Sequence, residues 1–160
     1  MKRDFTKYDI VFCDIDHTLV YGPFVEFMKW SWNVFKCQWF GHICMFLQSV
    51  FKWYKPNKEL IKILKGCKKV IFLTARAENV YTDMMVDEIM GYRPLTAQVI
   101  ATGAASPCGN KIHSIRMAMA DGSKVCLLDD NFHVREACLP YCDCFDVTHM
   151  FEPLIDNRKG

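Results

Sequence analysis

The sequence lacks the features that mark membrane-spanning or secreted proteins. The uncharged run Cys37 to Phe51 has only 15 residues and contains Gln38, His42 and Gln48. A membrane-spanning helix needs about 20 apolar residues, so no span is expected there. The basic start of the chain, Met1 to Phe5, is followed by no apolar segment typical of a secretory signal. The formal net charge of +2 indicates no particular polyanionic partner.

No two cysteines stand in a CxxC pair, and their total of nine is odd. Several lie within apparent strands or helices, among them Cys13, Cys67 and Cys126. We interpret them as reduced thiols and expect a cytoplasmic protein. With 160 residues, of which 51% are hydrophobic, the chain is long enough for one domain with a substantial core.

The most informative stretch is VFCDIDHTLV, from Val11 to Val20. If residues 8–13 form a buried strand, Asp14 and Asp16 project from its C-terminal end, where open α/β sheets bind ligands. The two carboxylates would begin on one face, about 6–7 Å apart. Acids that close favour a divalent cation or a shared proton at neutral pH. A turn that merely carries two aspartates is the alternative.

Other polar groups follow or begin further elements. Thr74 ends the apolar run VIFL and is followed by Arg76, Lys111 precedes a helix-like segment, and Asp129 and Asp130 end the run KVCLLDD. Each has an ordinary explanation alone, as a helix cap, a surface lysine or a turn. Together they supply acid, hydroxyl, ammonium and acid at four element ends, which favours a shared site.

Apolar runs and helix-like segments alternate along the rest of the chain. Strands separated by helices predict a parallel sheet with right-handed crossovers, an α/β fold. Besides the strand at 8–13, we expect strands at 70–73, 97–101, 124–128 and 144–147, and helices at 78–90 (closed by Gly91), 111–120 and 132–139.

The order and spacing of these motifs resemble the haloacid dehalogenase-like (HAD) superfamily, mostly phosphatases. Its pattern begins D-x-D-x-T and continues with Ser/Thr, Lys and a paired acid. The match spans most of the chain, and DIDHTLV is its specific part, although His17 stands where many relatives have glycine. The resemblance implies a three-layer Rossmann-like parallel sheet in which the first strand lies between those at 124–128 and 70–73. It also implies a core formed by residues 1–20 and 65–160.

The segment 21–64 is an insert after the first strand of that core. Residues 24–54 hold all four tryptophans, and Gly41 is expected to divide them into two helices. The resemblance implies a small helical cap. The apolar surface could also form a homodimer contact through residues 24–54, or lie in a membrane interface.

A basic stretch runs from Lys52 to Lys69, with Glu59 as its only acid. Such a row is usually a solvated helix face. The alternative is a contact with nucleic acid or with an anionic membrane.

The resemblance implies a Mg²⁺-dependent phosphomonoester hydrolase. Asp14 would be the nucleophile that forms an aspartyl-phosphate, and Asp16 the general acid and base, protonated with the help of repulsion from Asp14. Mg²⁺ would bind the Asp14 carboxylate, the Asp16 backbone carbonyl and Asp129, with Asp130 as a ligand or as a hydrogen-bond acceptor that orients one.

The substrate phosphate would be held by Thr74, Lys111 and Arg76. Candidate substrates are a small phosphorylated metabolite, a 3′-phosphate end of a nucleic acid and a lipid phosphate. A non-catalytic phosphate-binding or membrane-adaptor module on the same fold is the alternative function.

Overall fold

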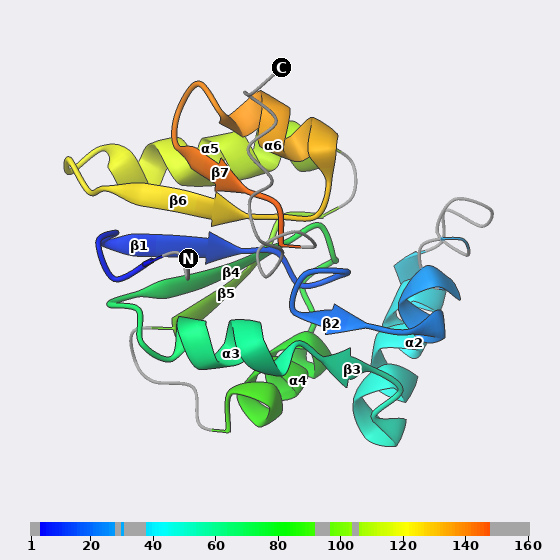
Figure 1. The fold of residues 1–160 in the computed structure, drawn as a ribbon. Coiled ribbons are helices and arrows are strands. Elements are labelled where there is room, and N and C mark those ends of the chain that lie inside the picture. The colour runs from blue at the N-terminus through cyan, green and yellow to red at the C-terminus, as the bar shows by residue number, and fades with distance from the viewer. Residues whose placement is uncertain (1–3, 28–29, 31–37, 92–96, 104–105, 148–160) are drawn as a thin grey trace, which may run out of the picture.

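A five-stranded parallel sheet forms the centre of the computed structural model, which describes residues 4–27, 30, 38–91, 97–103 and 106–147 (Figure 1). The strand order is β5-β4-β1-β6-β7. β1 pairs on one side with β4 and on the other with β6, so the predicted central position of the first strand is confirmed. The strands are β1 (Ile10–Cys13), β4 (Val70–Thr74), β5 (Ala97–Ala101), β6 (Val125–Leu128) and β7 (Asp143–Phe145).

Helices cover both faces of this sheet. They are α3 (Lys58–Leu64), α4 (Val80–Met90), α5 (Pro107–Met119) and α6 (Phe132–Cys138). Because side chains alternate along a strand, Val11 and Cys13 of β1 join the core beneath α3 and α4, while Phe12 packs in the core with Ile115 of α5. The chain is therefore an α/β protein with a doubly covered parallel sheet, compatible with a Rossmann-like fold.

Most predicted elements are present with shifted ends. α4 ends at Gly91, whose φ of 75° is readily adopted only by glycine, as expected. α5 begins at Pro107, earlier than predicted, because proline is well tolerated in the first turn of a helix. The eight cysteines within the described residues are free, in keeping with the expected reduced thiols.

The insert region differs from the prediction in two respects. Val20–Tyr21 (β2) and Lys55–Pro56 (β3) form a small antiparallel pair that the sequence did not reveal. The predicted break at Gly41 is wrong, because α2 (Gln38–Phe51) runs through it. One internal glycine costs a helix only about 1 kcal/mol, which packing of the flanking residues can offset. No helix among the described residues is long and apolar enough to cross a membrane.

α2 packs beside the start of α4. The Nδ1 atom of His42 lies 2.6 Å from Nδ2 of Asn79, which caps α4, and the Thr82 hydroxyl contacts the Met45 sulfur at 3.5 Å. Because α4 follows β4 in the chain, these contacts place α2 near the carboxyl edge of the sheet. Figure 1 shows α2 on the side toward which β1 and β6 point.

Candidate active site

The loop that leaves β1 positions the first two aspartates. The Asp14 amide donates to the Leu128 carbonyl at 2.9 Å, so this aspartate continues the β1–β6 pairing. The loop then reverses at His17, which has a φ of 62°. This left-handed conformation is uncommon for residues other than glycine.

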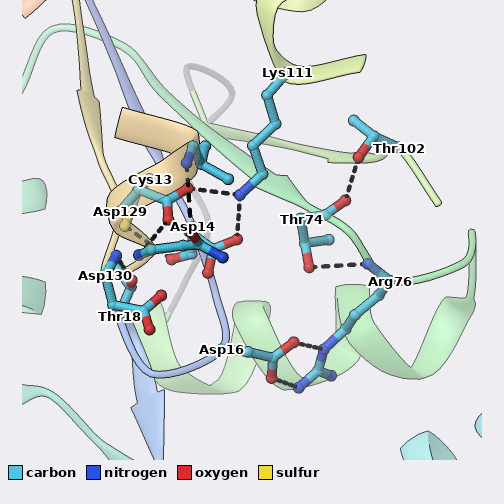
Figure 2. Close-up of polar contacts among 12 residues, drawn as sticks. Cys13, Asp14, Asp16, Thr18, Thr74, Arg76, Thr102, Lys111, Asp129 and Asp130 are labelled. Carbon is cyan, nitrogen blue, oxygen red and sulfur yellow. Dashed lines mark hydrogen bonds and ion pairs between the residues drawn. The ribbon is translucent and has the colours of Figure 1, made fainter. Parts of the chain in front are cut away.

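Lys111 joins two of the predicted acids. Its Nζ atom donates to Oδ1 of Asp14 and to Oδ2 of Asp129, both at 2.7 Å, and all three side chains are buried (Figure 2). Asp14 follows β1, Asp129 follows β6, and Lys111 lies in the first half of α5. Three elements that are distant in sequence thus meet at one edge of the sheet.

The charges of this group are unbalanced, since two carboxylates share one ammonium. Burial raises the pKa of Asp14 to about 7, and the nearby charge of Asp129 adds to the effect, although Lys111 opposes it. For Lys111, burial lowers the pKa, but the two carboxylates outweigh it and the net shift is upward. The lysine therefore remains charged, while Asp14 takes up a proton more readily than an ordinary aspartate.

The loop after β6 is held by several hydrogen bonds. The amide of Asp130 donates to the Thr18 hydroxyl at 3.2 Å, which ties this loop to the one after β1. Arg135 of α6 donates through Nη1 to the carbonyls of Asp129 and Asp130 at 2.7 and 2.6 Å. Its Nη2 contacts Asp146 at 2.6 Å. Arg135 therefore fixes the backbone that carries both acids.

Asp14, Asp129 and Asp130 form a group that could hold a metal ion. One carboxylate oxygen from each lies within 4.8 Å of the other two. An all-oxygen donor set suits a hard divalent cation such as Mg²⁺. The excess negative charge and the raised pKa of Asp14 also fit a place where a cation would be stabilised.

Asp16 and Arg76 form a second group. Nε of Arg76 donates to Oδ2 of Asp16 at 2.9 Å and Nη2 to Oδ1 at 2.5 Å, a bidentate ion pair (Figure 2). Burial alone would raise the pKa of Asp16, but Arg76 outweighs it and the pKa is lowered. The predicted protonation of Asp16 through repulsion by Asp14 is therefore wrong for this arrangement. The raised pKa belongs to Asp14 instead.

Thr74 lies at the end of β4, beside both groups in Figure 2. Its hydroxyl oxygen accepts the Arg76 amide at 3.3 Å, and its carbonyl accepts the Thr102 hydroxyl at 3.0 Å. Accepting a bond leaves the hydroxyl hydrogen of Thr74 for donation to a ligand oxygen. The hydrogen bond from the Arg76 amide is thus compatible with the predicted contact between the Thr74 hydroxyl and a phosphate.

Sequence reasoning missed two residues of this region. Thr18 belongs to the first motif but has no predicted role, although its hydroxyl accepts from Asp130. Arg135 gives no signal beyond a basic residue shortly after the paired acids, because its partners are backbone carbonyls. Both residues hold the backbone of the loop after β6 in place, and neither adds a further group to the predicted catalytic and phosphate-binding residues.

The chain matches no family model, no curated protein and no solved structure in the three comparisons made. Interpretation of the site therefore depends on its own chemistry. A buried carboxylate, a cation that contacts it, a neighbouring hydroxyl and an acid–arginine pair can together bind an anion and move a proton.

Proposed function

We propose that the protein is a Mg²⁺-dependent phosphomonoester hydrolase with a HAD-like fold. In this proposal residues 1–20 and 65–160 form the catalytic core, α3 packs on that core through Leu60, Ile61 and Leu64, and the rest of residues 21–64 forms a cap-like insert. The observation that supports it most is Lys111, whose Nζ atom lies 2.7 Å from acids that follow two adjacent strands. A surface lysine or an isolated turn does not account for a buried cation between two buried carboxylates.

Hydrolysis would proceed in two steps on Asp14. An oxygen of its carboxylate attacks phosphorus, the new O–P bond forms, and the bond from phosphorus to the ester oxygen breaks. The departing alkoxide takes a proton from Asp16. Water then attacks the aspartyl-phosphate, Asp16 accepts a proton from that water, and inorganic phosphate leaves with Asp14 restored. When bound by Asp14, Asp129 and Asp130, Mg²⁺ would neutralise charge on the phosphoryl group.

The basic and hydroxyl groups have distinct tasks in this scheme. Lys111 keeps a positive charge beside the attacking oxygen, and Thr74 donates its hydroxyl hydrogen to a phosphoryl oxygen. Arg76 would exchange its bond to Asp16 for one to the substrate phosphate. That exchange removes the group that lowers the pKa of Asp16 and so allows the acid to be protonated.

The test is phosphate release from para-nitrophenyl phosphate, with Mg²⁺ and with EDTA. We expect release only with Mg²⁺, and a loss of about a thousandfold or more in Asp14→Asn. Asp9→Asn is the matched control, because Asp9 precedes the same strand at its opposite end, where it bonds exposed Lys68. The control should retain activity close to that of the unchanged protein.

Equal release by wild type and Asp14→Asn would reject this mechanism. Phosphate binding without release would favour the non-catalytic module instead. Once activity is shown, a panel of sugar phosphates, nucleotides, 3′-phosphorylated DNA or RNA and lysolipid phosphates would identify the substrate class.

A further inference from the structure

Exposed aromatic side chains are concentrated on the insert. Trp39 is 70% exposed, Phe51 56% and Trp53 50%. Phe51 and Trp53 stack with ring centroids 5.1 Å apart, and Phe24 meets Trp53 at 5.3 Å. Trp53 thus contacts both Phe24 and Phe51, and the exposed fractions of Trp39, Phe51 and Trp53 show that they present apolar surface to solvent.

Most of these exposed residues lie on α2 or just after it. Cys44, Met45 and Gln48 are buried, and Met45 contacts Thr82 of α4. Trp39, Val50 and Phe51 are exposed, whereas the ring of Phe46 meets Tyr81 of α4 with centroids 5.1 Å apart. α2 therefore has one side that packs and another that carries aromatic and aliphatic groups in solvent. We call Trp39, Val50, Phe51 and Trp53 the aromatic surface.

Positive charge adjoins the aromatic surface in the chain. Residues 38–65 contain five lysines and one acid, Glu59. Lys52 bonds Glu88, whereas Lys55 of β3 and Lys58, Lys62 and Lys65 in and just after α3 are exposed. The three lysines of the α3 region are spaced by four and three residues, so they share one side of the helix. Figure 1 shows β3 linking α2 to α3.

We propose that the aromatic surface and the lysines at 55, 58, 62 and 65 bind the interface of an anionic membrane. Tryptophan and phenylalanine rings insert between the headgroups of such an interface, and lysines meet lipid phosphates beside them. A second copy would place two surfaces of like positive charge together, which opposes association. A nucleic acid would satisfy the lysines but offers no apolar layer for Val50.

Binding would hold α2 against the lipid and keep the carboxyl edge of the sheet nearby, through the contact of His42 with Asn79. The proposal does not depend on phosphatase activity, because vesicle binding is measured without substrate. Absence of phosphatase activity would leave the membrane proposal intact, and absence of vesicle binding would leave the proposed phosphatase function intact.

The experiment uses the full chain and two kinds of vesicle, phosphatidylcholine alone and equimolar phosphatidylcholine with phosphatidylglycerol. We expect flotation with the anionic vesicles, weakening as salt is raised, and little with the neutral ones. Replacing both Trp39 and Phe51 by serine should weaken anionic-vesicle binding by about tenfold or more. The matched control replaces both Phe132 and Leu139 by serine. Phe132 in α6 is 61% exposed and Leu139 just after it is 62% exposed, and this variant should bind the anionic vesicles as the wild type does.

A second measurement needs no variant. All four tryptophans lie within residues 30–53, so tryptophan fluorescence of the wild type reports on this part of the chain alone. Brominated phospholipids in the anionic vesicles should quench it. Absence of flotation, equal weakening in both double variants, or flotation without quenching would overturn the proposal. So would a dimer in solution that the Trp39→Ser, Phe51→Ser variant converts to a monomer.

Discussion

Replacing Asp14 by asparagine should stabilise the metal-free protein at alkaline pH. Asparagine has nearly the shape of aspartate, and its carbonyl oxygen can still accept from Lys111. The change leaves one buried carboxylate, Asp129, for one ammonium and so removes the excess negative charge. Replacement of the proposed nucleophile should therefore change the free energy of unfolding and not only the proposed activity.

The size follows from the pKa of Asp14, which is about 7 in the folded protein against an ordinary 3.8. Between these values the folded state binds a proton that the unfolded state has lost, so wild-type stability falls as pH rises. The fall amounts to on the order of 4 kcal/mol by pH 8. Asparagine cannot titrate, so the variant lacks this decline.

The assay is urea unfolding in EDTA at pH 4, 6 and 8, comparing wild type with Asp14→Asn. The two should be nearly equal at pH 4, and the variant should be more stable by on the order of 4 kcal/mol at pH 8. Saturating Mg²⁺ should stabilise only the wild type, by about 2.7 kcal/mol at a hundred times its dissociation constant. The difference in the free energy of unfolding between the variant and the wild type at pH 8 should then become smaller.

Asp9→Asn tests the sign. Its carboxylate has a lowered pKa, through the Lys124 amide and Lys68, so ionisation favours the folded state. Compared with the wild type, Asp9→Asn should lose stability between pH 4 and pH 8, whereas Asp14→Asn should gain it. A difference between Asp14→Asn and wild type that stays constant from pH 4 to pH 8 would refute the electrostatic account of Asp14.

Three further changes have defined outcomes. Arg76→Gln should raise the pKa of Asp16, because the substitution removes the guanidinium that lowers this pKa. Carbon-13 NMR titration of the Asp16 carboxyl in EDTA measures the shift, and an unchanged pKa would contradict the role given to the ion pair. Arg135→Lys should weaken Mg²⁺ binding by about tenfold or more in calorimetry, because Arg135 holds the backbone carbonyls of Asp129 and Asp130. Asp146→Asn removes only the ion pair with Arg135 and spares those two bonds, so it should have a smaller effect. Gly41→Ala should raise the free energy of unfolding by about 0.5–1 kcal/mol, since a side chain there would meet no atom of the described residues within 4 Å. A loss of stability would contradict the continuous helix.

The sheet was predictable because its strands are buried on both faces. Val70–Leu73 and Val125–Leu128 therefore appear as continuous apolar runs, and their polar end residues stand out. Parallel strands bring their carboxyl ends to one edge, so the sequence pattern predicts Asp14 and Asp129 at the same edge of the sheet. That their two strands are neighbours was implied only by the family resemblance.

Pairings within the site could not be predicted in the same way. The sequence suggests separate roles for Asp16 and Arg76, but their bond joins residues 60 positions apart and depends on how two loops face each other. The β2–β3 pair is similar, because each strand has only two residues and no pattern of its own. The break predicted at Gly41 is absent because the cost of one glycine is smaller than the gain from packing α2 on α4.

The contacts between the loop after β1 and α2 form a series. Asp16 is held by Arg76, Arg76 reaches the Thr82 hydroxyl at 3.5 Å, and that hydroxyl contacts Met45 of α2. A tilt of α2 would consequently be transmitted to the guanidinium of Arg76 and from there to the carboxylate of Asp16. If the protein has the proposed phosphatase activity and binds a membrane through the aromatic surface as proposed, its turnover would differ between bulk water and a membrane surface.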